Sequence, residues 1–371
     1  MRLEDLRDQL DELDASLIDL AAKRLDLVRQ VAEAKVASGG KLFDRGRERV
    51  VLDRARRLSR ERGVDPELGA SLVHALVEAG HGLQAKRLAE STSGQRRSVL
   101  IVGGAGEMGR LFQRAFTERG HRVDVLEKGD GRDRAEAVAA ADVVLIAVSM
   151  AVAEQVAAEL LPLVRPDALL CDINSLKQGI CEVYAGGGSC ETLGLHPMFG
   201  GSVGSLRRQK VVACPVRPGP LSTWLLAELG ALGLEVIEST PADHDRMMAV
   251  VQVLLHFRTV VSGEAFRRAG VAVADSLRFT SPIYRLEMSV VARLFAQDAQ
   301  LYASILLGNP AAAEMRGHFL DAAQEVSDLL AAGDREGFQR LFDGVHDWFG
   351  PFSEEAMRMS DAIIDGLTSR A

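Results

Sequence analysis

The first 90 residues place apolar side chains at a helical period and contain no convincing strand pattern. One stripe recurs at steps of three and four residues and consists of Leu3, Leu6, Leu10, Leu13, Leu17, Leu20, Leu27, Val31 and Ala34. This spacing predicts an amphipathic helix over 2–38, which would run roughly 55 Å at about 1.5 Å per residue. A domain of this size cannot cover so long a helix alone, so the stripe predicts pairing with a second copy.

Two shorter helical segments follow the long one. They are predicted near 44–62 and 66–89, with "GVDP" (63–66) between them. The next stretch, "ESTSGQRRS" (90–98), is polar and rich in turn residues, which is typical of a linker.

From residue 98 the pattern changes to short apolar runs separated by helical stretches. The stretch "SVLIVGGAGEMGRLFQRAFTERGHRVDVLEKGD" (98–130) predicts a strand, a glycine turn, a helix and a second strand. Further strands are predicted at 142–148, 168–173, 192–195, 210–216 and 234–240. This alternation predicts a mostly parallel, doubly wound sheet. After Pro241 the strand pattern stops, and long helical patterns continue to the end of the chain.

A glycine-rich turn lies between the first strand and the first helix of this region. Gly104 begins a G-x-G-x-x-G pattern in the strand–turn–helix context that dinucleotides require. The residues that would contact the cofactor here are Gly104, Gly106, Glu107, Met108 and Gly109. Glu127 ends the next strand, where a carboxylate would hold the ribose 2′-hydroxyl and repel a 2′-phosphate. The pattern therefore favours NAD over NADP, against the alternative of a glycine-rich turn without a nucleotide.

The stretch "TLGLHPMFGGS" (192–202) ends a predicted strand with a histidine before a proline. Pro197 biases His196 toward extended backbone, at the start of a glycine-rich loop. The position is compatible with a buried, hydrogen-bonded core histidine or with a catalytic one.

Composition and charge narrow the class of protein. The chain has 371 residues, of which 47% are hydrophobic and 26% charged, which indicates a globular protein of two or three domains. A net charge of −8 argues against a nucleic-acid partner. The four cysteines lack C-x-x-C spacing, so neither a metal site nor a disulfide framework is predicted. The start lacks the apolar core of a signal peptide, and the longest apolar run, 143–153, is too short to span a bilayer, so we expect a cytoplasmic protein without a membrane partner.

A charge interrupts the apolar stripe of the first helix. Arg24 occupies a stripe position, and Lys35, eleven residues later, lies about 20° away on the same face. Arg7 lies about 100° from Arg24 and would face elsewhere, such as a partner subunit. A second charged patch follows at helical spacing and consists of Asp44, Arg47 and Glu48. The spacing alone fits an intramolecular network of ion pairs as well as a ligand site.

The motifs "LRDQLDELD", "LAAKRLDLV", "VAEAK" and "DRGRERVVL" resemble the all-helical chorismate mutase family, whose members are intertwined dimers. The resemblance implies a site that binds two substrate carboxylates, the ether oxygen and the ring hydroxyl. Its residues would be Arg7 of the partner subunit, Arg24, Arg47, Lys35, Gln84 and Glu48, with Asp44 nearby. One departure is Gly80, where the family commonly has serine.

The motifs "VLIVGGAGEMGRLF", "LGLHPMFG", "SPIYRLEM" and "ARLFAQDAQLYASIL" resemble prephenate dehydrogenase. The order of both halves resembles the fused chorismate mutase–prephenate dehydrogenases of tyrosine biosynthesis. The resemblance implies an all-α N-terminal domain (1–90), a linker (91–97), an α/β Rossmann domain (98–240) and an all-α C-terminal dimerisation domain (241–371). It also implies a homodimer that converts chorismate to prephenate and then, with NAD, prephenate to 4-hydroxyphenylpyruvate. Departures are Ser149 and Gly201, where proline is frequent.

The dehydrogenase resemblance also assigns residue roles. His196 would accept the proton of the ring hydroxyl, and Ser175 in "DINSLK" (172–177) would hydrogen-bond near it, with Lys177 close by. Arg293 would hold a substrate carboxylate. Two further residues remain open: Arg285 fits an ion pair or a substrate contact, and His244 fits the pocket, a helix cap or the surface. Tyrosine is a candidate feedback inhibitor at the Arg293 pocket.

Two other functions remain possible from the sequence. The first is an NAD-dependent prephenate or arogenate dehydrogenase whose N-terminal helices only dimerise or regulate, which Gly80 would favour. The second is an NAD-responsive binding protein, which would leave His196 and Arg293 without a purpose.

Overall fold

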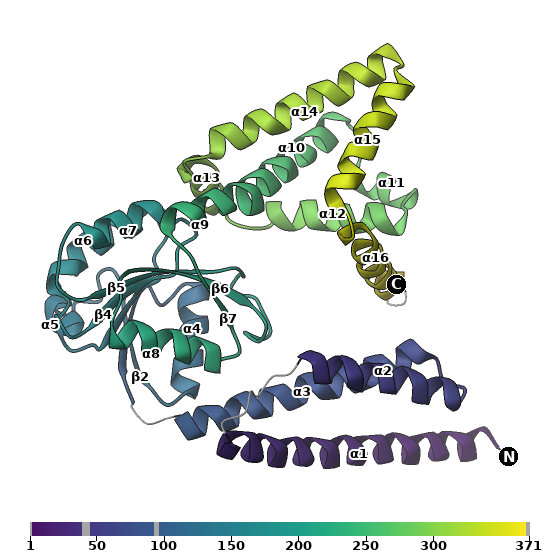
Figure 1. The fold of residues 1–371 in the computed structure, drawn as a ribbon, viewed down its shortest axis with the longest axis horizontal. Coiled ribbons are helices and arrows are strands. Elements are labelled where there is room, and N and C mark those ends of the chain that lie inside the picture. Colours follow the sequence, from purple (N-terminus) through teal and green to yellow (C-terminus); the bar gives the residue numbers. More distant parts are fainter. Residues whose placement is uncertain (1, 39–44, 93–95, 369–371) are drawn as a thin grey trace. The chain divides into compact units, whose positions relative to one another are not determined.

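The computed structural model describes the backbone of residues 2–38, 45–92 and 96–368 (Figure 1). Side chains are described for these residues except 32–38, 45–49, 78, 81–92 and 367–368. The chain forms two compact units. The first comprises Met1–Val148, Val156–Ile173 and Tyr184–Glu238, and the second comprises Ser149–Gln155, Asn174–Val183 and Ser239–Ala371.

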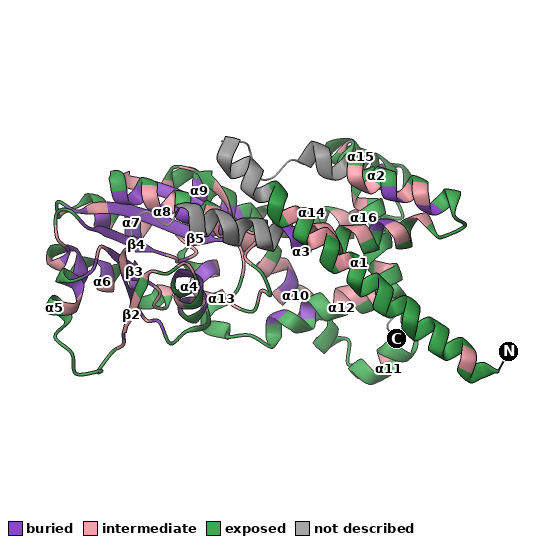
Figure 2. Ribbon diagram, turned by 90° about the horizontal axis from the view of Figure 1, so that it is seen from below, coloured by how far each residue is buried: buried purple, intermediate pink, exposed green. Residues whose placement is uncertain are grey.

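Three helices form the N-terminal part of the first unit: α1 (Leu3–Ser38), α2 (Arg45–Glu61) and α3 (Pro66–Thr92). The three predicted helices are therefore confirmed, and α3 continues three residues beyond the expected end at 89. The leucine stripe of α1 remains exposed in the single chain, with Leu10 60%, Leu13 61% and Leu17 57% accessible. Figure 2 accordingly shows α1 almost wholly in the colour of exposed residues.

The rest of the first unit contains a seven-stranded sheet of order β2-β1-β3-β4-β5-β6-β7. The strands are β1 (Ser98–Val102), β2 (Arg122–Leu126), β3 (Val143–Ile146), β4 (Leu169–Asp172), β5 (Glu191–Pro197), β6 (Lys210–Arg217) and β7 (Glu235–Glu238). The connecting helices are α4 (Glu107–Glu118), α5 (Arg134–Ala139), α6 (Met150–Leu160), α7 (Gln178–Ala185) and α8 (Pro220–Ala231). The predicted mostly parallel sheet is confirmed. β6 runs antiparallel to β5 because residues 198–209 form a loop and supply no helical crossover.

Apolar side chains cover both faces of this sheet. Phe112 of α4 and Leu225 of α8 belong to one buried cluster with alternate strand residues such as Ile101. Leu100 and Val144, which point to the opposite face, are also buried. Figure 2 shows the strands mainly in the colour of buried residues. Near-continuous apolar strands are expected when helices lie on both faces of a parallel sheet.

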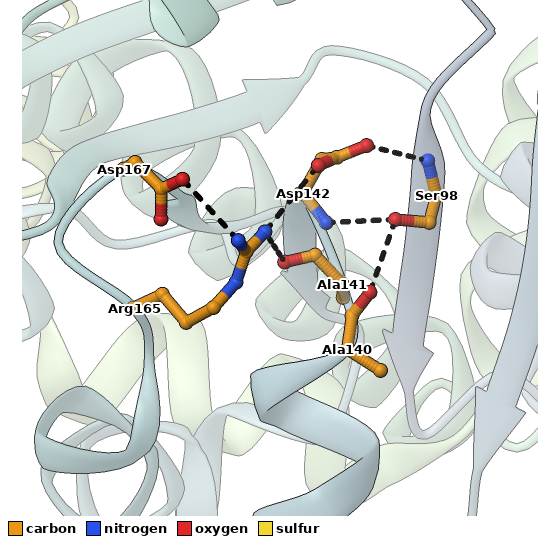
Figure 3. Close-up of polar contacts among 6 residues, drawn as sticks. All are labelled: Ser98, Ala140, Ala141, Asp142, Arg165 and Asp167. Carbon is orange, nitrogen blue, oxygen red and sulfur yellow. Dashed lines mark hydrogen bonds and ion pairs between the residues drawn. The ribbon is translucent and has the colours of Figure 1, made fainter.

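Polar contacts join the amino ends of the strands (Figure 3). The Ser98 N–H donates to Asp142 Oδ2 at 2.9 Å, and the Asp142 N–H donates to Ser98 Oγ at 3.0 Å. Arg165 donates to the Ala141 carbonyl at 3.2 Å and contacts both Asp142 and Asp167. These contacts hold β1, β3 and the segment before β4 in register at the edge opposite their carboxyl ends.

The second unit is dominated by helices. They are α9 (Pro241–Met248), a π-helix (Ala249–Leu254), α10 (Leu255–Arg268), α11 (Val273–Arg278), α12 (Pro282–Phe295), α13 (Ala299–Gly308), α14 (Ala312–Ala332), α15 (Arg335–Phe349) and α16 (Phe352–Thr368). The expected helical region is confirmed. Ser281 caps α12, since its Oγ accepts the Tyr284 N–H at 3.2 Å and Pro282 is the first helical residue. The π-helix was not predicted. None of the described helices is long and apolar enough to cross a membrane.

Candidate active site

The predicted glycine turn connects β1 to α4, and close packing explains its first and last glycines. A Cβ on Gly104 would lie 2.7 Å from Val125 of β2, and a Cβ on Gly109 would lie 2.6 Å from the Gly104 Cα. Gly103, which the sequence reasoning did not select, has a positive φ of 84° and begins the turn. The turn therefore needs glycine at these positions, because the Val125 side chain and the Gly104 backbone come too close for a Cβ.

The middle of the turn is open and fits a pyrophosphate. The nearest atom to a Cβ on Gly106 would be the Gly103 carbonyl oxygen, 3.7 Å away. α4 begins at Glu107, and no side chain among the described residues caps its first turn. Uncapped N–H groups at a helix N-terminus attract an anion. Met108 packs against the core cluster and holds this end of α4 on the sheet.

Glu127 follows β2 and lies at the same turn. Its carboxylate accepts the Ala105 N–H at 2.6 Å. The negative charge is thus placed beside the glycine turn, where the sequence predicts contact with the ribose.

The loop after the predicted catalytic strand also approaches this turn. A Cβ on Gly201 would lie 2.5 Å from the Glu107 Cβ. Gly201, a departure from the family pattern, is therefore the residue that lets this loop pack against the start of α4.

His196 lies on β5 opposite Val212 of β6, and only 2% of its surface is exposed. Its extended backbone agrees with the effect predicted for Pro197. The parallel strands end level with one another, because Val102 pairs with Leu126 and with Ile146. Asp172 at the end of β4 pairs with Gly194, two residues before His196. The structure therefore brings His196, Glu127 and the glycine turn to one edge of the sheet.

A second group of predicted residues lies in the second unit, around a carboxylate that the sequence reasoning missed. Asp245 accepts the N–H groups of Lys177 and Gln178, each at 2.9 Å, and lies 2.7 Å from His244 Nδ1. Lys177 is fully buried, and Ser175, two residues earlier, is half-buried. Burial alone would raise the pKa of Asp245, but the hydrogen bonds from His244 and the two N–H groups outweigh burial and lower that pKa.

The structure also narrows the alternatives for His244. Thr240, not His244, caps α9, and the histidine is 2% exposed. A cap and a surface position are therefore wrong.

The predicted arginines of α12 are both exposed in the single chain. Burial raises the pKa of Tyr302, and the positive charge of Arg293 opposes this rise, so these two side chains interact. The Tyr302 ring lies edge-on to His256, with 4.9 Å between ring centroids. Arg285 lies two turns before Arg293 on the same helix.

In the N-terminal helices, Arg24 Nη1 donates to the Leu76 carbonyl at 2.8 Å. A guanidinium has five N–H donors, so this bond leaves donors for a substrate carboxylate.

Gly80 is buried, and a Cβ there would lie 3.1 Å from Val28 of α1, which gives this glycine a packing role. Arg7 is exposed. Asp44 lies outside the described residues, as do the side chains of Lys35, Arg47, Glu48 and Gln84.

Within the described part of the chain, no cluster of three His, Cys, Asp or Glu side chains could hold a metal. All four cysteines are unbridged and buried. A parallel sheet with a glycine turn and a carboxylate at its carboxyl edge, joined to a helical unit that carries arginines, defines a nicotinamide-dependent dehydrogenase.

Comparison with known proteins identifies the family within this class. The family model for chorismate mutase type II matches residues 6–85. The models for the nucleotide-binding and dimerization domains of prephenate dehydrogenase match 113–221 and 240–344. The chain is 34% identical to the T-protein of Enterobacter agglomerans, over 98% of this chain and 97% of that protein. It is 32% identical to the T-protein of Haemophilus influenzae, over 98% and 96%. The chain therefore belongs to the T-proteins, the bifunctional chorismate mutase/prephenate dehydrogenases.

Solved structures share the fold of the dehydrogenase part. A prephenate dehydrogenase from A. aeolicus, solved with hydroxyphenyl propionate and NAD+, superimposes with a TM-score of 0.53 at 17% identity, over 70% of this chain and 99% of that one. A putative prephenate dehydrogenase from Corynebacterium glutamicum gives 0.57 at 20% identity, over 70% and 89%.

Proposed function

We propose that this chain catalyses two consecutive reactions, chorismate to prephenate and then prephenate to 4-hydroxyphenylpyruvate with NAD. The observation that carries this function is the nearly full-length match to two T-proteins, together with the mutase and dehydrogenase family models that match this chain in that order. The product of the first reaction is the substrate of the second, so both belong to tyrosine biosynthesis.

The mutase reaction is a pericyclic rearrangement, which needs neither a nucleophile nor a general base. The site acts by holding a compact conformer and by stabilising the charge that develops on the ether oxygen. We assign the carboxylates to Arg24, Arg47 and the partner's Arg7. Lys35 and Gln84 donate to the ether oxygen, and Glu48 accepts from the ring hydroxyl, with Asp44 beside it.

In the dehydrogenase, NAD supplies the hydride acceptor. The open glycine turn, the uncapped start of α4 and Glu127 support this cofactor. Neutral His196 takes the proton of the ring hydroxyl as the hydride leaves the same carbon. The bond to the ring carboxylate breaks, CO2 departs, and the electron pair of that bond makes the ring aromatic, while the ring oxygen takes a proton back to give the phenol of the product. We also assign Ser175 to the dehydrogenase, as a hydrogen-bond partner near the ring hydroxyl, together with Lys177.

The remaining substrate contacts come from the helical unit. Arg293 binds a substrate carboxylate, bidentate where geometry allows. It acts mainly in binding, since strong stabilisation of the departing carboxylate would oppose decarboxylation. Arg285 and His244 are further residues that we assign to substrate binding.

The proposed assembly is a homodimer. The exposed leucine stripe of α1 supports it, because a helix with this much accessible apolar surface needs a partner. A reducing cytoplasm is supported by four unbridged thiols.

Tyrosine is proposed to compete for the Arg293 pocket, because it differs from the product mainly by an amine in place of the keto group. Titration of tyrosine against dehydrogenase activity tests this, and an absence of inhibition at millimolar concentration contradicts it.

One assay tests the whole function. The purified protein is given chorismate and NAD, and chorismate loss and NADH formation are followed separately. We expect both. NADH formation from prephenate without loss of chorismate would instead indicate a non-catalytic N-terminal module, and no NADH from prephenate would refute the dehydrogenase.

A further inference from the structure

One buried aspartate, through its carboxylate and its backbone carbonyl, joins three separate segments of the second unit. Asp245 on α9 is 2% exposed and accepts the N–H groups of Lys177 and Gln178. Its carboxylate also contacts Nδ1 of His244. The turn between α13 and α14 completes the group, because Asn309 Nδ2 donates to the Asp245 carbonyl at 2.8 Å.

The position of this carboxylate is unusual for a helix cap. The first N–H groups of a helix need an acceptor, which normally comes from a residue just before the helix. For α7 the acceptor comes from a residue 67 positions later than Gln178. A negative charge at a helix N-terminus is also favoured by the helix dipole. The start of α7, and with it the loop just before it, therefore depends on α9.

We propose that Asp245 is a positioning residue for the dehydrogenase. Through the Lys177 N–H it sets the backbone that carries Lys177 and Ser175. Through its contact with His244 Nδ1 it holds the orientation of that imidazole ring. The inference rests on the proposed function, because Ser175, Lys177 and His244 are the residues assigned there to the substrate.

The alternative is a carboxylate that only stabilises the fold. These two roles predict different effects of a small substitution at Asp245 on stability and on the kinetic constants. A structural role lowers the melting temperature and all activities together, whereas a positioning role changes the constants for prephenate alone. The mutase activity of the same chain is an internal control, because its proposed residues lie within the first 90.

The test is Asp245→Asn, which keeps the size of the side chain but removes its charge and one acceptor. Asp243→Asn is the matched control, since Asp243 lies on the same helix, is exposed, and contacts only Thr240 and Arg246 in the described chain. For Asp245→Asn we expect kcat/KM for prephenate to fall about 10- to 100-fold, as for a displacement of reacting groups by about 1 Å. We expect KM for NAD and mutase turnover to stay within about twofold of the wild type. Asp243→Asn should match the wild type in every constant.

Two results would overturn the inference. One is a folded Asp245→Asn protein with wild-type constants for prephenate. If this variant loses every activity instead, Asp245→Glu decides, because it keeps the charge and both acceptor oxygens but displaces them by one methylene from the N–H groups of Lys177 and Gln178. Unchanged prephenate constants in Asp245→Glu then overturn the inference, and a selective loss supports it. Failure of the proposed function is distinct, because the wild type would then form no NADH from prephenate.

Discussion

His196 is buried on β5, and burial alone fits a core histidine as well as a catalytic one. His196→Asn separates the two roles, because asparagine keeps some hydrogen bonding but cannot act as a base. We expect dehydrogenase turnover to fall about 10²- to 10⁴-fold, the usual contribution of a general base. NAD binding and mutase turnover should persist, since the glycine turn and the N-terminal helices are unchanged.

The measurement is the melting temperature and both activities on one His196→Asn preparation. A core role predicts a lower melting temperature with weaker NAD binding. Near-normal dehydrogenase turnover in a well-folded variant would refute the catalytic role.

The preference for NAD is assigned to Glu127, whose carboxylate lies at the glycine turn. The wild type should use NAD at far lower concentration than NADP, because this charge repels a 2′-phosphate. Glu127→Ala should reduce this preference for NAD over NADP. The preference is measured as the ratio of kcat/KM for the two cofactors. Asp124→Ala, which removes a carboxylate from β2, is the control and should keep the wild-type ratio. Equal use of both cofactors by the wild type is the result that contradicts this assignment.

The glycine turn could be predicted from the sequence, whereas the contacts of Asp245 could not, because they join residues far apart in the chain. The turn depends on Gly104 and its near neighbours, so a local motif identifies it. Asp245 acts on residues 67 and 68 positions away, which no local pattern reveals. The one local signal was that Asp245 directly follows His244, which the sequence had already marked as a candidate.

Among the elements, the helices and strands could be predicted because their apolar periods are local. The direction of β6 could not, since it depends on the loop 198–209 and on its long-range pairing with β5. The π-helix (Ala249–Leu254) also has no periodic signal distinct from an α-helix in so short a segment.

α4 and α8 are joined by a buried group of charges. Glu228 of α8 contacts Arg119 and His121, with only 6% to 8% of each side chain exposed. Burial would raise the pKa of Glu228, but the bonds from Arg119 and His121 lower it to about 2, from an ordinary 4.5. Such a carboxylate contributes stability at neutral pH that declines as the pH falls below about 4.5 and is lost near 2.

Glu228→Gln should therefore lower the melting temperature at pH 7 by a few degrees and flatten its dependence on pH between about 5 and 3. Glu264→Gln is the control, since the pKa of Glu264 is also lowered to about 2, through Arg267 and Arg268, but on the surface. Exposed ion pairs contribute little, so this variant should barely change the melting temperature. If the melting temperature of Glu228→Gln depends on pH as steeply as that of the wild type, the stabilising role of the Glu228 carboxylate is contradicted.

For the whole molecule, the order of domains could be predicted because each part has its own pattern, and three family models match in that order. The dimer cannot be derived in the same way, because the structure of a single chain shows only which apolar surface is exposed. Leu13 and Leu20, each 61% exposed on α1, indicate where a second copy would bind. They do not identify which residues a mutase site takes from each chain.

Subunit mixing tests that arrangement. If each mutase site takes Arg7 from one chain and Lys35 from the other, Arg7→Ala and Lys35→Ala homodimers are both inactive as mutases. A mixed dimer has one site with both substitutions and one with neither. Random exchange makes half of all dimers mixed, so mutase activity should return to about a quarter of the wild-type value. Lys35→Ala mixed with Gln84→Ala is the matched control, because both residues are assigned to the same chain and no mixture should restore a site. Dehydrogenase activity, measured throughout, reports that exchange has left the protein folded. If Arg7 acts within its own chain, the first mixture stays as inactive as the second, and the shared site is wrong.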